Sequence, residues 1–164
     1  MPEAFERLDL RYFSAFTNVH TLALENAQIS RFIPDIGRYF EHFSLTLRSI
    51  ALYNPDCTPL QLSYFLSFFP NLDDVNVDHT GSPMDDTPPT NLVSFSAPKL
   101  RGQLTLRHSR WAETWTHLID SSGGLRFRHM HLREVGNCEP TLLRACAETL
   151  ETLRFNASDS SIGE

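Results

Sequence analysis

The stretch that decides the fold is TLRSIALYNPDCTPLQLSYFLSFFPNLDDVNVD, residues 46–78. Near each end it has apolar residues at the first, fourth and sixth of six positions: Leu47, Ile50 and Leu52, and then Leu72, Val75 and Val77. The alternation that ends each hexad predicts a short strand with one buried face. Between the hexads, Thr58, Pro59 and Gln61 predict a helix start with an N-cap, a proline at the first helical position and a capping box. Pro70 predicts the end of that helix.

The same hexad recurs along the whole chain, with one variant near residue 100 that contains an extra residue. Its fourth-position residues are Leu8, Leu22, Ile50, Val75, Leu104, Met130 and Leu153. The successive spacings are 14, 28, 25, 29, 26 and 23 residues. Five of the six lie in the period of about 20–29 residues that is typical of leucine-rich repeats. The short first spacing indicates a degenerate terminal unit.

Apolar residues at helical spacing lie between the hexads. These stripes are Leu62, Phe65, Leu66 and Phe69; Ile33, Ile36, Phe40 and Phe43; Trp111, Trp115 and Leu118; and, after Pro140, Leu143, Cys146 and Ala147. Strand followed by helix at this period predicts an α/β fold, a right-handed leucine-rich-repeat-like solenoid of about six to seven irregular repeats. Its curved parallel sheet would form the concave side and its helices the convex side. We interpret the stripes as core and expect no cofactor.

The sequence predicts a single solenoid domain over residues 1–164. Residues 80–98 are rich in Pro, Ser, Thr and Asp and have no helical period, which predicts an irregular loop. Residues 156–164 are predicted to be a polar tail. Ser82 and Thr87 each precede a proline, so they are candidates for proline-directed phosphorylation, with an unmodified, solvated loop as the alternative.

Composition and charge exclude several classes of protein. Hydrophobic residues make up 41% of the chain, which is too much for a disordered protein. A net charge of −6 disfavours phosphate backbones, so we expect no nucleic-acid partner. Three cysteines without a CxxC pair indicate reduced thiols. The sequence shows neither a signal peptide nor an apolar run of roughly 18 residues, so we expect no membrane association and an intracellular location, cytoplasmic or nuclear.

Residues 46–78, together with LETLRFNAS at residues 150–158, resemble the leucine-rich-repeat-like region of F-box proteins from mushroom-forming fungi. In that family an F-box binds the Skp1 adaptor of a cullin ubiquitin ligase, and the repeats are thought to select the substrate. The resemblance implies a protein–protein interaction module that recognises a ubiquitin-ligase substrate. No F-box precedes the repeats, so we expect no Skp1-type adaptor as partner. We expect the chain to be a fragment of a longer F-box/LRR-type protein, with a shortened gene product or a repeat-only relative as alternatives.

The third and fifth positions of each hexad, and the residue after it, point away from the core. These rows predict a concave surface for an unknown protein partner. Its candidate binding residues are Asp74, Asn76, Asp78, Thr105, Arg107, His129, His131, Arg133 and Arg154. An acidic band in the fourth unit lies next to a basic C-terminal band. We expect a partner with an opposite pair of charges, or an acidic segment near Arg107, Arg133 and Arg154; solvated strand residues without a partner are the alternative.

The pattern of potential ligands and nucleophiles does not indicate catalysis. His129 and His131 share one strand face and Cys138 and Cys146 follow, but no tight pair of ligands is present, so we expect no metal. The chain contains no GxSxG, HExxH, Walker loop or GxGxxG, so we expect no catalytic residue and no enzyme. Two other hypotheses stay open. One is a self-associating or scaffold repeat protein that uses an exposed strand edge. The other is an enzyme of unknown type, which a convex-side pocket with converging titratable groups would indicate.

Overall fold

The computed structural model describes residues 15–78, 100–107, 115, 118–119, 125–133 and 140–156. The elements in chain order are β1 (Thr21–Glu25), α1 (Ile29–Phe32), the 3-10 helix η2 (Ile33–Asp35), α2 (Ile36–Ser44), β2 (Ser49–Tyr53), α3 (Pro59–Ser67), β3 (Asp74–Asp78), β4 (Gln103–Arg107), β5 (His129–Arg133), α5 (Pro140–Cys146) and β6 (Thr152–Asn156). Trp115, Leu118 and Ile119, between β4 and β5, are also helical. None of the described helices has the length and apolar character to cross a membrane.

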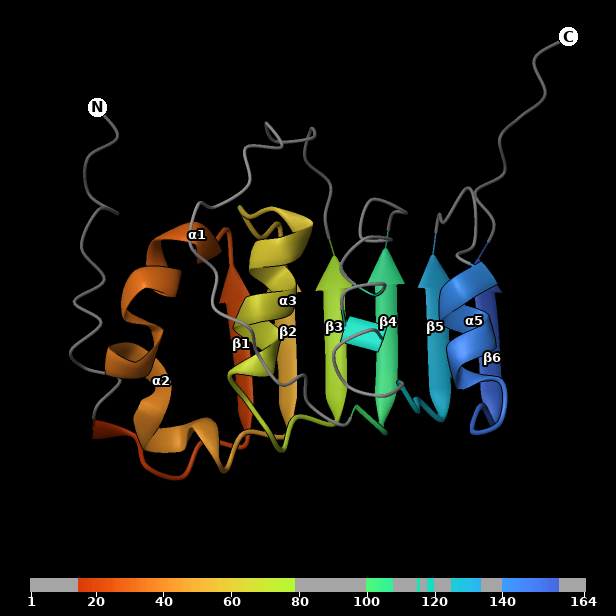
Figure 1. The fold of residues 1–164 in the computed structure, drawn as a ribbon, viewed down its shortest axis with the longest axis horizontal. Helices are drawn as coiled ribbons and strands as arrows, with labels where there is room; N and C mark the ends of the chain where they lie inside the picture. Colours follow the sequence, from red (N-terminus) through yellow and green to blue (C-terminus); the bar gives the residue numbers. More distant parts are fainter. Residues whose placement is uncertain are drawn as a thin grey trace, which may run out of the picture.

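The six strands form one parallel sheet, and their order in space is their order along the chain (Figure 1). The register places equivalent hexad positions opposite one another. The fourth-position row runs through Leu22, Ile50, Val75, Leu104, Met130 and Leu153. Every described strand therefore coincides with a predicted one, and the α/β class is confirmed.

The period of two along each strand divides the sheet into two faces. On β2, β3, β4 and β5 the fourth and sixth hexad residues are buried. The described helices all lie over this same face, and the crossovers through α2 and α3 are right-handed (Figure 1), as parallel connections almost always are. No described helix covers the opposite face, which we call the helix-free face.

A cluster of aromatic rings packs helix α2 against helix α3. Phe40 on α2 is fully buried, and its ring centroid lies 5.5 Å from that of Phe65 and 5.9 Å from that of Phe69. Phe32 and Phe43 complete the cluster at 5.6 and 5.8 Å from Phe40. All four contacts are edge-to-face, the arrangement that the ring quadrupoles favour. These stripes are thus core, as their helical spacing predicted.

Helix α3 begins with the capping box that its sequence predicts. The side-chain hydroxyl of Thr58 accepts a hydrogen bond from the N–H of Gln61 at 3.3 Å. In return, the Gln61 side-chain oxygen accepts one from the N–H of Thr58 at 2.9 Å. Two N–H groups that a helix start leaves without partners are satisfied in this way.

At four of the five junctions between neighbouring strands, a strand is fixed to the previous one by a shared acceptor just before the strand begins. The carbonyl of Arg48, which precedes β2, accepts hydrogen bonds from the N–H groups of Asp73 at 2.8 Å and Asp74 at 2.9 Å. These donors are the residue before β3 and its first residue. Three other carbonyls each accept an equivalent pair of bonds from the unit that follows them: those of His20, Gly102 and Arg128. Because both donors must meet one oxygen, these bonds set the register at the start of β2, β3, β5 and β6.

At two of these junctions, a threonine hydroxyl also donates hydrogen bonds that link one unit to the unit before it. The hydroxyl of Thr46 lies 2.9 Å from the carbonyl oxygen of Val19, one unit back, and 3.1 Å from that of Phe43 in α2. Thr149 repeats the arrangement at 3.3 Å from the carbonyl oxygens of both Phe127 and Cys146. Each hydroxyl shares its proton between the two acceptors, and so ties the end of a helix to the preceding hexad.

We expect Thr149→Val and Thr46→Val each to lower the free energy of unfolding by about 1 kcal/mol, because valine keeps the shape but leaves two carbonyls without this donor. Urea unfolding measures the change. Thr21→Val, on the exposed side of β1, is the matched control and should change the stability by less than about 0.5 kcal/mol. An equal loss in all three variants would contradict the structural role of these hydroxyls.

The structure departs from the predicted pattern at β6. The pattern predicts that Leu153 and Phe155 are buried, but they are 42% and 50% exposed. The physical reason is that β6 is the edge of the sheet, so no further described unit packs beside it. Asn156 belongs to β6, so the predicted tail starts one residue too early. Several predictions fall outside the described residues. These are the first predicted hexad, the loop at residues 80–98 that contains Ser82 and Thr87, and the positions of Trp111 and Cys138.

Candidate functional site

The helix-free face presents three outward side chains from each of the six strands, and the register aligns them in rows. From β1 to β3 these residues are Thr21, Ala23, Glu25, Ser49, Ala51, Tyr53, Asp74, Asn76 and Asp78. From β4 to β6 they are Gln103, Thr105, Arg107, His129, His131, Arg133, Thr152, Arg154 and Asn156. All nine predicted binding residues are therefore brought onto one surface.

Charge divides this surface into two halves. The outward residues of β1–β3 include three carboxylates and no cationic side chain: Glu25, Asp74 and Asp78. Those of β4–β6 include three guanidinium groups, two imidazoles and no carboxylate: Arg107, Arg133, Arg154, His129 and His131. The formal charges are thus −3 and +3 with neutral imidazoles. We call these two regions the acidic half and the basic half.

The two halves meet at an ion pair. Nη1 of Arg107 on β4 lies 3.5 Å from Oδ2 of Asp78 on β3, and both side chains are partly exposed, at 38% and 27%. A pair this exposed contributes little to stability. The other carboxylate oxygen of Asp78, Oδ1, is buried and has no hydrogen-bond partner among the described residues. The pair therefore neutralises part of the charge at the boundary and leaves the outer strands of each half charged.

Asp74, a predicted binding residue, has a structural role at the junction between β3 and β4. Here the N–H of Gly102 donates to the carbonyl of Asp73 at 3.1 Å. The second donor, the N–H of Gln103, instead binds Oδ1 of Asp74 at 2.7 Å. The Asp74 side chain thus replaces the shared carbonyl of the other junctions, in the unit whose hexad has an extra residue. A β-carbon at Gly102 would collide with this carboxylate, so the site requires glycine.

We expect Gly102→Ala to lower the free energy of unfolding by about 1–3 kcal/mol, because the new methyl group displaces the Asp74 carboxylate from the N–H of Gln103. Gly37→Ala on α2 is the matched control, because its β-carbon would meet nothing within 4 Å. In a helix that change stabilises by about 0.5–1 kcal/mol. Thermal and urea unfolding measure both changes. In an Asp74→Ala background the cost of Gly102→Ala should shrink; an undiminished cost would show that the collision is elsewhere.

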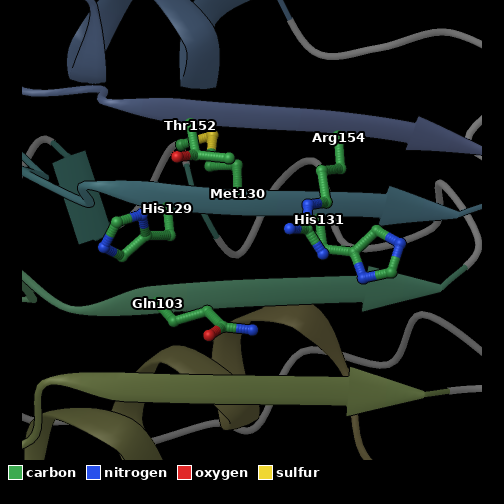
Figure 2. Close-up of a pocket in the computed structure, with 6 residues that line it drawn as sticks. All are labelled: Gln103, His129, Met130, His131, Thr152 and Arg154. Carbon is green, nitrogen blue, oxygen red and sulfur yellow. The ribbon is translucent and has the colours of Figure 1, made fainter.

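The basic half contains a shallow hollow. It has a volume of about 310 Å³ and is lined by Gln103, His129, Met130, His131, Thr152 and Arg154. Figure 2 shows Arg154 extending from β6 across β5 toward His131, with His129 and Gln103 at the other end of the hollow. Hydrogen-bond donors from three neighbouring strands therefore surround one open space.

Hydrogen bonds fix part of this hollow. Nε of Arg133 donates to Nε2 of His131 at 3.2 Å. The Gln103 amide nitrogen donates to the hydroxyl of Thr105 at 3.1 Å and keeps its second N–H available. Arg154 is exposed and forms no ion pair or hydrogen bond with any described residue. Its guanidinium is the largest source of unpaired positive charge at the hollow.

A second hollow, of about 370 Å³, lies in the acidic half and is lined by Glu25, Tyr53, Asn54 and Asp78. Asn54 follows β2 with a φ of 48°, in the left-handed region that asparagine tolerates better than most residues. Its N–H donates to the carbonyl of Asp78 at 2.7 Å. This bond continues the β2–β3 pairing past the end of β2. The register places Tyr53 opposite Glu25 on one side and Asp78 on the other.

Neither hollow was predicted as such from the sequence. The alternation identifies Gln103, Thr152, Glu25 and Tyr53 as outward residues, but it gives no reason to select them. Only the register between strands shows that they adjoin the predicted charged residues. The left-handed turn at Asn54 has a weak sequence signal, because Asn26 has the same place after β1 and the same conformation.

The chain matches no protein-family model, no curated protein and no solved structure.

The structure describes one of the two cysteines that the sequence places near His129 and His131. Cys146 is fully buried on α5, and desolvation raises the pKa of its thiol against the smaller, lowering effect of a hydrogen bond with the Phe127 backbone. A protonated, buried thiol is a poor nucleophile and a poor metal ligand. Within the described parts of the chain, no three His, Cys, Asp or Glu side chains converge in a way that could hold a metal ion.

Proposed function

We propose that this chain is a right-handed, leucine-rich-repeat-like solenoid of about six to seven irregular repeats, and that it binds a protein partner on its helix-free face. Three features support the solenoid: the hexad spacing, the in-register parallel sheet and the recurrence of the same pair of hydrogen bonds at four of the five junctions. In such a solenoid the helix-free face is the concave side, which these folds use for binding. A role as the substrate-recognition part of a ubiquitin ligase stays a prediction from resemblance.

The observation on which the binding proposal depends is the division of the helix-free face into an acidic and a basic half. Opposite charges on a partner would be attracted in one orientation and repelled in the other, which gives specificity as well as faster association. Neighbouring strands lie about 4.8 Å apart, so β2 and β5 are separated by roughly 14 Å. An extended chain advances at most about 3.5 Å per residue. A segment with cationic and anionic residues about four or five positions apart would therefore reach both halves.

Titration of the isotope-labelled protein with hexaglutamate and hexalysine, followed by amide NMR shifts, tests this proposal. We expect hexaglutamate to shift amides of β5 and β6, and hexalysine to shift those around Glu25 and Tyr53, because each peptide complements one half. The double variant Arg133→Glu/Arg154→Glu should weaken hexaglutamate binding about tenfold or more at low salt.

Arg31→Glu/Arg38→Glu, with both changes in the helical layer on α1 and α2, alters the net charge equally and is the control. It should leave the shifts at β5 and β6 in place. Loss of hexaglutamate binding in both double variants, or shifts spread evenly over the molecule, would mean that net charge alone attracts the peptide and that this face is not a binding surface.

Self-association is the second candidate function, and one observation favours it. Leu153 and Phe155 are half-exposed on β6, an edge strand whose outer backbone groups have no strand partner among the described residues. Exposed edges of this kind pair with other chains. If copies associate through β6, the mass measured by light scattering should rise with concentration, and Phe155→Asp should return it to that of a monomer. A concentration-independent monomer would exclude this function.

A further inference from the structure

We propose that the first hexad of the sequence, residues 5–10, adds as a further strand beside β6 of a second copy of this chain, so that copies join head to tail. This inference rests on self-association, the second candidate function, and names the segment that meets the β6 edge. It follows from the exposed side chains of β6, from the charge of Arg154 and from the short spacing after the first hexad.

Strand β6 lies at the edge of the sheet but has the apolar side chains of an inner strand. It is the last strand of the described sheet (Figure 1). Leu153 and Phe155 are 42% and 50% exposed, whereas their counterparts on β5, Met130 and Leu132, are each 1% exposed. An exposed strand edge pairs readily with another strand. One more hexad beside β6 would cover its apolar side chains as β6 covers those of β5.

The hexad at residues 5–10, FERLDL, complements this edge. In the register of the described strands, its Leu-Asp-Leu at residues 8–10 would lie beside the Leu-Arg-Phe of β6 at residues 153–155. The leucines would then cover the exposed apolar side chains, and Asp9 would meet Arg154 on the helix-free face. Opposite charges on neighbouring strands stabilise their pairing. The guanidinium of Arg154 forms no ion pair with any described residue, so it is free to accept this partner.

The other charged residues of the segment do not oppose this arrangement. Its two arginines would meet uncharged side chains of β6: Arg7 would meet Thr152, and Arg11 would meet Asn156. Glu6 would lie just before the strand, near Glu151, but the Glu151 carboxylate already has Nε of Arg128 at 3.9 Å. Asp9 and Arg154 therefore form the contact that decides the charge balance.

The hexad has too short a connection to form a normal unit beside β1 of its own copy. Its equivalent of β1, residues 21–25, is residues 7–11, so only residues 12–20 would connect the two strands. A crossover between parallel neighbours needs about a dozen or more residues. The shortest crossover between described strands, residues 134–151, is twice as long as residues 12–20. The first hexad thus lacks room for the helix that covers the other units.

The same connection hardly reaches β6 of its own copy. β1 and β6 are the two edges of the described sheet, so a strand outside β6 would lie six spacings, or roughly 29 Å, from β1. A parallel connection must also return the length of a strand, roughly 17 Å. The straight path is then about 33 Å, and the connection reaches at most about 36 Å when fully extended. A second copy can present its β6 without this stretching.

Pairing between two β6 edges, the simplest symmetric alternative, is unfavourable. The antiparallel arrangement that places Leu153 opposite Phe155 of the other copy also places the two Arg154 side chains opposite each other. Like charges directly opposite one another destabilise a strand pair. The head-to-tail arrangement instead brings the basic half of one copy toward the acidic half of the next. Because it joins two different surfaces, it can repeat from copy to copy.

An exchange of charge between Asp9 and Arg154 tests this inference. Multi-angle light scattering at low salt measures the mass of the whole chain over a range of concentrations. We expect the mass of the unchanged chain to rise with concentration, because every copy has one hexad to donate and one edge to receive it. Asp9→Arg and Arg154→Asp should each weaken the association about tenfold or more, because each places like charges side by side.

A mixture of these two variants should associate again, because each finds on the other the opposite charge that it lacks in itself. Mixing cannot restore a pairing within one copy, so this result would show that the hexad and the edge belong to different copies. The control Glu3→Arg makes the same change in charge outside the hexad and should leave the association unchanged. Circular dichroism confirms that each variant is folded before the masses are compared.

The outcomes separate this inference from self-association itself. If Phe155→Asp abolishes association but Asp9→Arg does not weaken it, or if the mixture stays dissociated, copies meet at β6 through another segment; the inference is then overturned and self-association stands. A chain that is monomeric at every concentration overturns both. Equal losses in Glu3→Arg and Asp9→Arg would mean that net charge controls the association, and would overturn the pairing of this hexad with β6.

Discussion

The shared carbonyl found at four of the five strand junctions is the constraint on which the rest of this structure depends. Two successive N–H groups of one unit meet a single oxygen of the unit before, and the strands then continue in parallel with hexad positions aligned. A slip of one residue would turn every side chain to the other face. The buried rows and the charged rows both exist because this register is fixed at its start.

The junction between β3 and β4 shows how the constraint tolerates irregularity. The hexad of this unit has one more residue than the others, and only one of the two usual donors reaches the backbone oxygen. The Asp74 carboxylate accepts the bond of the second, and Gly102 leaves the room for it. A side chain thus supplies an acceptor that the backbone cannot, and β4 keeps its register with β3.

The sequence predicted much of this fold because its signals are local. Alternation identified the strands, and helical spacing identified buried rings such as Phe40 and Phe65. The structural role of Asp74 and the bond between Arg133 and His131 could not be predicted, because each depends on which side chains the sheet makes neighbours. The exposure of Phe155 was missed for a related reason: alternation indicates which face a residue points toward, but not whether another unit covers it.

The order of the strands has a consequence for how the chain folds. Each strand pairs with the strands directly before and after it in the chain, so no pairing has to wait for a distant segment. Folding can begin at one well-packed pair of units, such as the one around Phe40, and spread outward one unit at a time. The last strand to join would be the first to fray, and amides of β6 would exchange with solvent sooner than those of β2. Stability in this chain would then be graded along its length.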